Sequence, residues 1–140
     1  MADRVLIQKA AHSLSLYRGN RLLKTYNVAL GPNAEGPKRQ QGDGRTPDGT
    51  YVIDARKRYS AFHRALHISY PNEVDRRRAR RLGVAPGGDI MIHGLPNGMG
   101  AIGKAHLVRD WTQGCIAVTN EEIEEIWRIV PNGTRVEVKP

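Results

Sequence analysis

Hydrophobic and polar residues alternate along the first third of the chain. Alternation with a period of two is typical of β-strands that bury one face. The alternating sets are Val5 and Ile7, then Leu14 and Leu16, then Leu22, Tyr26, Val28 and Leu30. The pair Gly19-Asn20 lies between the second and third sets, and it predicts a hairpin turn. The pattern therefore predicts a β-rich N-terminal region.

The remaining strand signals are shorter. Residues 50–55, 65–69 and 134–138 predict strands, and the continuous apolar run at 90–92 predicts a short strand buried on both faces. Glycine, proline, asparagine and aspartate accumulate from 31 to 49, which predicts a long surface loop. Loops of that length often carry function.

Two segments have helical patterning instead. A polar helix is predicted over residues 73–82. The clearer helix covers 120–130, where apolar residues recur three and four positions apart, and Thr119 and Glu122 have capping-box spacing at its start. Between the two helices, a glycine-rich loop is expected at 98–103. These elements predict a single domain covering the whole chain, mainly β with two short helices.

Composition is consistent with that fold. A chain of 140 residues can bury a core without disulfides or a bound metal. With 39% hydrophobic and only 6% aromatic residues, the core must consist of valine, isoleucine and leucine. No apolar stretch is long enough to span a bilayer, and the first 20 residues lack the apolar block of a signal peptide. The net charge of +8 predicts attraction to an acidic partner without identifying it.

The chain has one cysteine, Cys115, which can form no internal disulfide and no multi-cysteine zinc site. It is either a small buried hydrophobe or a reactive thiol. Gly114 precedes it, and a glycine there lets the chain turn sharply so that backbone N–H groups can face an oxyanion. The capped helix after it would favour the thiolate if the segment folds back toward the helix N-terminus.

A nucleophilic thiol needs a base, and His93 is the best placed of the five histidines. It ends the apolar strand and is followed by Gly94, an arrangement that fixes an imidazole at a rigid sheet edge. His12, His63 and His106 are interpreted as ordinary surface residues. The alternative for His93 is a histidine that satisfies a buried hydrogen bond.

These residues resemble the signature of the YkuD-type L,D-transpeptidases, which is His-Gly, a spacer, then Ser/Thr-His-Gly-Cys. The matching residues are His93-Gly94 and Thr112-Gln113-Gly114-Cys115-Ile116. Residues 46–51 are similar to the family's Thr-Pro-x-Gly-x-aromatic stretch. The resemblance implies a β-sandwich or barrel catalytic domain that needs no metal or cofactor.

The resemblance also implies the reaction. Cys115 would attack the L-to-D bond between diaminopimelate and D-alanine in a peptidoglycan stem peptide, and His93 would accept the thiol proton. A thioester would form, and an amine would then give a cross-link or an anchored protein, whereas water would give hydrolysis. The backbone amides of Gln113, Gly114 and Cys115 would form the oxyanion hole. The carbonyl of Gly94 would fix the His93 tautomer.

The sequence departs from that signature on the side of the site that binds the acyl donor. Gln113 stands where many members have a second histidine, and Ala117 stands where many have arginine. Gln113 cannot carry a positive charge. Trp111, Thr112 and Ala117 are expected to contact the substrate. A cysteine hydrolase, either a carboxypeptidase or an amidase acting on the same polymer, is the alternative enzyme, and a non-catalytic wall-binding domain is the third reading.

Two basic clusters could attract a binding partner. The first consists of Arg76, Arg77, Arg78, Arg80 and Arg81, and the second consists of Arg56, Lys57 and Arg58. Each is either a solvated face or a surface for anionic wall polymer and stem-peptide carboxylates. A nucleic-acid partner is not expected, because no basic stretch is interleaved with aromatics. We expect a monomer in the periplasm or another extracytoplasmic space, with its leader peptide missing from this chain.

Overall fold

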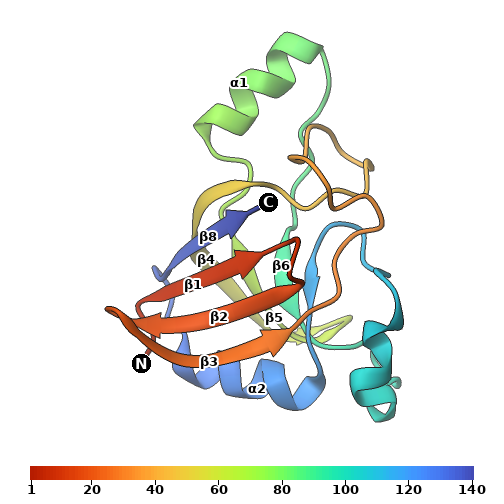
Figure 1. Ribbon diagram of the computed structural model, residues 1–140. Coiled ribbons are helices and arrows are strands. Elements are labelled where there is room, and N and C mark those ends of the chain that lie inside the picture. The colour runs from red at the N-terminus through yellow and green to blue at the C-terminus, as the bar shows by residue number, and fades with distance from the viewer.

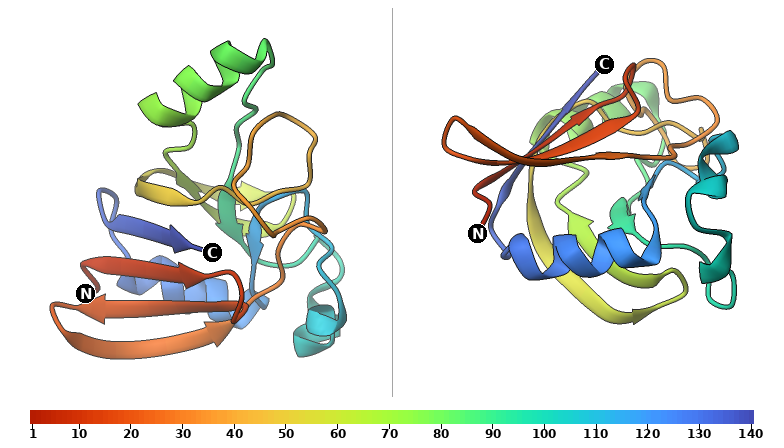
Figure 2. Two further views of the ribbon diagram at one scale, coloured as in Figure 1. Left: turned by 45° about the horizontal axis from the view of Figure 1, so that its top comes forward. Right: turned by 60° about the horizontal axis from the view of Figure 1, so that its bottom comes forward.

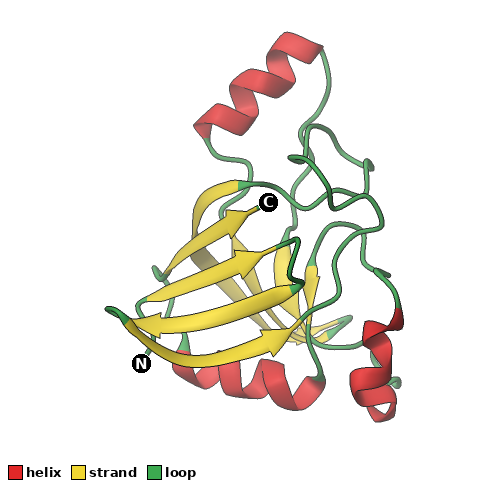
Figure 3. Ribbon diagram, viewed as in Figure 1, coloured by secondary structure: helices red, strands yellow, loops and turns green.

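A computed structural model describes all 140 residues and confirms the mainly β chain, as a single mixed sheet of eight strands (Figure 1, Figure 3). The strand order is β3-β2-β1-β8-β4-β5-β6-β7. The β1–β8 and β6–β7 pairs are parallel, and the other neighbours are antiparallel. The strands are β1 (Arg4–Gln8), β2 (Ser13–Arg18), β3 (Arg21–Asn27), β4 (Gly49–Ser60), β5 (His63–Ile68), β6 (Met91–His93), β7 (Ile116–Ala117) and β8 (Arg135–Lys139).

Backbone pairing links the two ends of this sheet. Ala29, just after β3, and Ala117 of β7 exchange two N–H to carbonyl hydrogen bonds of 3.0 and 2.9 Å. Figure 2 shows that the sheet curls round, and that helix α2 (Asn120–Ile129) lies beside its strands. On the other side of β7, the parallel pairing with β6 puts the segment before β7, which contains Cys115, beside β6.

The core consists of aliphatic side chains, as the composition requires. The largest fully buried side chains are Ile7, Leu14, Leu16, Leu30, Ile53, Leu66, Ile68, Ile92, Leu95, Ile116, Ile123 and Ile126. Helix α2 contributes the last two from the predicted apolar face. Its capping box is present, because Thr119 Oγ1 accepts the Glu122 N–H at 3.2 Å and Glu122 Oε1 accepts the Thr119 N–H at 2.8 Å. Burial of this face is what stabilises the helix.

Helix α1 (Glu73–Leu82) has the predicted bounds and projects from the sheet (Figure 1). Its Asn72 cap accepts the Asp75 N–H, and Gly83 ends it in the left-handed conformation, at φ +66°. The Tyr51 hydroxyl of β4 donates to Asp75 Oδ2 at 2.8 Å, which connects the helix to the sheet. The helix therefore presents most of its surface to solvent.

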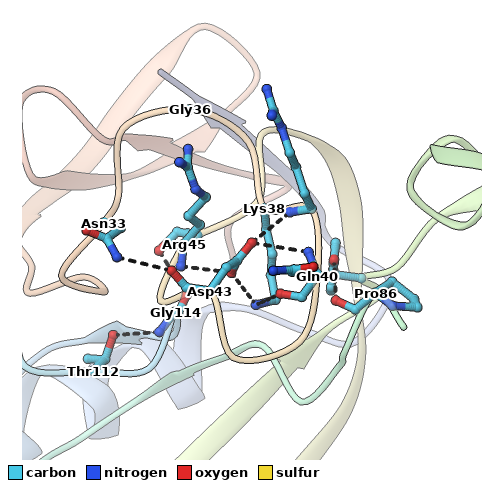
Figure 4. A network of polar contacts seen from close by, with 12 residues as sticks. Asn33, Gly36, Lys38, Gln40, Asp43, Arg45, Pro86, Thr112 and Gly114 are labelled. Carbon is cyan, nitrogen blue, oxygen red and sulfur yellow. Dashed lines mark hydrogen bonds and ion pairs between the residues drawn. The ribbon is translucent and has the colours of Figure 1, made fainter. Parts of the chain in front are cut away.

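The predicted long loop lies between Ala29 and β4, and polar contacts hold it in place. Asp43 is at its centre (Figure 4): its carboxylate accepts the N–H groups of Arg39, Gln40 and Arg45 at 2.9, 3.1 and 3.1 Å, and Lys38 Nζ donates to it at 2.9 Å. These four hydrogen bonds lower the pKa of Asp43 to about 2, although its partial burial acts in the opposite direction. The carboxylate is ionised at neutral pH.

Two sequence expectations about this fold were wrong. Residues 100–108 form a short 3₁₀ helix, η1 (Gly100–Val108), where only a glycine-rich loop was expected, so the chain has three short helices. Two glycines, Gly100 and Gly103, hid this helix, and Gly103 interrupts it with a φ of +56°. Leu22 was assigned to a buried face but is 51% exposed. The β2–β3 register shifts at a bulge between Leu16 and Tyr17, and Leu22 lies beyond this shift on the edge strand β3.

Candidate active site

Cys115 and His93 line the same cavity, which has a volume of about 950 Å³. The parallel β6–β7 register puts Ile92 opposite Ile116 and His93 opposite Ala117, so His93 of β6 lies beside the strand that Cys115 directly precedes. The long loop forms another wall of this cavity through Lys38 and Gln41. A second cavity of about 940 Å³ lies beside Lys9 and His12 and contains neither Cys115 nor His93. The first cavity is therefore the candidate site.

The turn before Cys115 requires glycine. Gly114 has φ +120°, and a Cβ there would lie 2.6 Å from the carbonyl oxygen of Arg45. Thr46 Oγ1 donates to the Gly114 carbonyl at 2.9 Å. Thr112 Oγ1 accepts the Gly114 N–H at 3.1 Å and donates to the Cys115 carbonyl at 2.8 Å. Contacts from two segments thus fix the backbone that carries the thiol.

The thiol of Cys115 has two backbone neighbours. Sγ accepts the Met91 N–H at 3.4 Å and donates to the Asp89 carbonyl at 3.3 Å. Burial raises the pKa of this thiol and the charge of Asp89 adds to the rise, while the Met91 N–H and the charge of Lys38 oppose it. The raised pKa favours the neutral thiol over the thiolate at pH 7.

His93 is buried and held in one orientation. Its Nδ1 lies 2.7 Å from the carbonyl oxygen of Gly94, which only accepts, so Nδ1 carries the proton and Nε2 has the free lone pair. The Phe62 ring stacks on the imidazole at 4.3 Å. Burial lowers the pKa of His93 to about 4, although the Gly94 carbonyl acts in the opposite direction. His93 is thus a neutral imidazole with an available base nitrogen.

An aromatic group lies next to this imidazole. The ring centroid of Trp111 is 5.9 Å from that of His93 and 6.0 Å from that of Phe62. Trp111 Nε1 donates to His106 Nδ1 at 3.1 Å, and His106 is only 7% exposed. The interpretation of His106 as a surface residue was wrong, because η1 folds it against Trp111. Phe62 was not a sequence candidate, and its being the only phenylalanine was its one distinguishing signal.

The residues expected to contact the substrate differ in how accessible they are to the cavity. Ala117 is fully buried, is paired with Ala29 and His93, and does not line the cavity. Thr112 borders the cavity, but its hydroxyl is engaged by Gly114 and Cys115. Trp111 and the exposed Gln113 line the cavity and are available.

The Gly114 amide was expected in the oxyanion hole, but it already donates to Thr112 Oγ1. The amides of Gln113 and Cys115 have no acceptor in the chain. No group of three or more His, Cys, Asp or Glu side chains could hold a metal ion. No helix has the length and apolar character to cross a membrane.

The profile of the YkuD family, described as an L,D-transpeptidase catalytic domain, matches residues 2–138. The chain belongs to this family. It is 30% identical over 138 residues to YafK of Escherichia coli K12 and 31% identical over 137 residues to YkuD of Bacillus licheniformis, both provisionally named L,D-transpeptidases. These alignments cover 93% and 98% of the chain but 48% and 66% of the two relatives. The chain thus spans half to two thirds of the length of these relatives.

Solved structures agree with this family. The helical cell shape determining protein Pgp2 of Campylobacter jejuni superposes with a TM-score of 0.76 at 25% identity, over 99% of this chain and 48% of Pgp2. L,D-transpeptidase 1 of Mycobacterium tuberculosis superposes with a TM-score of 0.59 at 14% identity, over 98% of this chain and 60% of that chain. The second likeness shows a shared fold only. The mainly β fold is thus that of a YkuD-family domain.

Proposed function

We propose that this YkuD-family domain transfers an acyl group of a peptidoglycan stem peptide through a thioester on Cys115. The observation that carries the proposal is the shared cavity, which is lined by the partly exposed Cys115, directly before β7, and by His93 of the adjacent strand β6, whose imidazole has a free Nε2. The bond cleaved is the L-to-D amide between diaminopimelate and D-alanine. Family membership supports this bond, and the single cysteine of the chain is the only thiol that can attack it.

The raised pKa of Cys115 and the low pKa of His93 favour attack by a neutral pair. As Sγ leaves the Asp89 carbonyl and bonds to the substrate carbonyl carbon, the thiol proton passes to His93 Nε2. The tetrahedral intermediate collapses when the protonated His93 returns this proton to the D-alanine nitrogen and the C–N bond breaks. D-Alanine leaves with a neutral amine, and a thioester remains.

The oxyanion of that intermediate requires donors. The unbonded N–H groups of Gln113 and Cys115 are the two we assign to it. Thr112 and Thr46 support these amides indirectly, because they hold the intervening Gly114 by its N–H and its carbonyl. A neutral Gln113 side chain adds no charge there.

The second half-reaction determines the product. An acceptor amine attacks the thioester, His93 takes its proton and returns it to the Cys115 sulfur, and a new amide forms. Water in place of the amine gives a shortened stem peptide, which is the hydrolase alternative. We place the reaction outside the cytoplasmic membrane, where peptidoglycan lies, and expect a monomer.

The arginines of α1 support attraction of the domain to an anionic wall polymer. Arg76, Arg77 and Arg81 are exposed and have no acidic partner, whereas Arg78 and Arg80 lie 3.7 and 3.8 Å from carboxylates of their own helix. The second predicted cluster is weaker, because Arg56 donates to the Trp127 and Val130 carbonyls at the end of α2. Any attraction would be screened by salt.

Incubation with tetrapeptide muropeptides tests the proposed function. The products are separated and identified by mass spectrometry, and the Cys115→Ala and His93→Ala variants are treated in the same way as controls. Joined stems identify a transferase, and a tripeptide stem with free D-alanine identifies a hydrolase. Release of D-alanine that survives in the Cys115→Ala variant would refute a thioester on this residue.

A further inference from the structure

A buried lysine lies in the wall of the cavity that contains Cys115. Lys38, from the long loop, is only 3% exposed and borders this cavity. Its Nζ donates to Asp43 Oδ1 at 2.9 Å and to the Gln40 carbonyl at 3.2 Å. An ammonium group has three N–H donors, so one donor of Lys38 has no acceptor in the protein. A buried charge with an unused donor is costly unless a further acceptor binds there.

Asp43 orients this ammonium group without fully compensating it. The carboxylate also accepts the N–H groups of Arg39, Gln40 and Arg45 (Figure 4). Its negative charge is therefore shared among four donors, three of them backbone dipoles. The positive charge of Lys38 remains partly available to a second anion in the cavity.

No other group on the cavity wall can provide this cation. Among the lining residues, Lys38 is the only lysine or arginine, and His93 is a neutral imidazole. Gln113, next to the catalytic turn, is uncharged, and Asp89 on the same wall repels anions. An anionic group of a bound molecule is therefore attracted to the Lys38 side of the cavity.

We propose that Lys38 is a specificity-determining residue that binds the C-terminal carboxylate of the D-amino acid released from the substrate. This proposal rests on the proposed function. In a stem tetrapeptide, that carboxylate is attached to the carbon next to the scissile nitrogen. When the scissile carbonyl meets Cys115, the carboxylate lies only a few bonds away, inside the same cavity. Lys38 thus selects peptides that end one residue after the bond to be cleaved.

Calorimetric titration of the Cys115→Ala protein, which cannot turn substrate over, tests this site. The probes are a stem tetrapeptide with a free C-terminal carboxylate and the same peptide as its C-terminal carboxamide. We expect the acid to bind at least about tenfold more tightly than the amide, as for a charge-assisted hydrogen bond. Adding Lys38→Met should make the two affinities equal, and Lys38→Arg should keep the preference.

Arg45→Met is the matched control, because it removes a cation from the same loop whose side chain faces the other cavity. It should leave the preference for the acid unchanged. Equal affinities for acid and amide in a protein that retains Lys38 would overturn the proposal, even if Lys38→Met did not fold. A preference that survives in a folded Lys38→Met protein would also overturn it.

Failure of the proposed function gives a different result. If the unaltered chain releases no D-alanine but the acid preference is present and depends on Lys38, the carboxylate site stands and the reaction on Cys115 is wrong. If D-alanine is released and no acid preference is measured, the reaction stands and the role of Lys38 is wrong.

Discussion

Replacing Thr112 with valine should destabilise the turn that holds Cys115. The substitution keeps the shape of the side chain, so no cavity forms, but it removes a hydroxyl that makes two hydrogen bonds in a position only 5% exposed. Loss of the bond to the Cys115 carbonyl costs about 1 kcal/mol net, and leaving the buried Gly114 N–H without an acceptor costs about 1–3 kcal/mol. The free energy of unfolding should therefore fall by about 2–4 kcal/mol.

Urea titration followed by circular dichroism measures this change, with Thr112→Ser as the matched control. Serine keeps the hydroxyl and loses one methyl group, so it should cost about 1 kcal/mol. Acylation of Cys115 should also slow in the valine variant, because the amides on either side of Gly114 lose their alignment. A valine variant within about 0.5 kcal/mol of the parent chain would refute the role assigned to the hydroxyl.

Three further experiments test other parts of the structure. Alkylation of Cys115 by iodoacetamide should be slow at pH 7 and should still be accelerating near about pH 9, because burial raises the thiol pKa; a full rate at pH 6 would instead indicate a thiolate. Gly114→Ala should cost at least about 2 kcal/mol and stop acylation, since the new Cβ meets the Arg45 carbonyl at a positive φ; a normal melting temperature would contradict this. Arg56→Met should lower the free energy of unfolding in urea by about 1–3 kcal/mol, because the carbonyls at the end of α2 lose their donor. The control Lys57→Met, at an exposed neighbouring position, should leave this free energy almost unchanged.

The elements that the sequence predicts best are those whose signals are local. Helix α2 has both an apolar face at helical spacing and a capping box within four residues, and its observed bounds differ from the prediction by one residue. The bounds of α1 follow from Asn72 and Gly83, which cap it from the adjoining positions. Local preferences and packing agree in these segments, so the prediction needed no knowledge of the tertiary structure.

The features that the sequence did not predict depend on how the chain folds back on itself, over long or short separations. Ala117 is buried because the sheet closes on Ala29, 88 residues earlier, and no local pattern encodes that pairing. His106 is buried because η1 folds it against Trp111. Lys38 has the same local sequence character as the exposed cations around it, and only the position of Asp43 distinguishes it.

The site is an intermediate case. The signature around Cys115 and His93 identified two residues that do share one cavity. It did not predict that the thiol pKa is raised, which depends on burial, nor that Thr112 takes up the Gly114 amide. The residue types thus indicated the chemistry, while the protonation states and available donors required the three-dimensional arrangement.

Intact-mass spectrometry after incubation with a carbapenem tests the central claim, that Cys115 is an acylated nucleophile, most directly. Attack of the thiol on the strained lactam carbonyl opens the ring and retains every atom, so the chain should gain the full mass of one carbapenem molecule. Peptide mapping should locate this mass on Cys115, and His93→Ala should slow its formation. No mass gain by the folded chain, or an equal gain by the Cys115→Ala variant, would contradict the account.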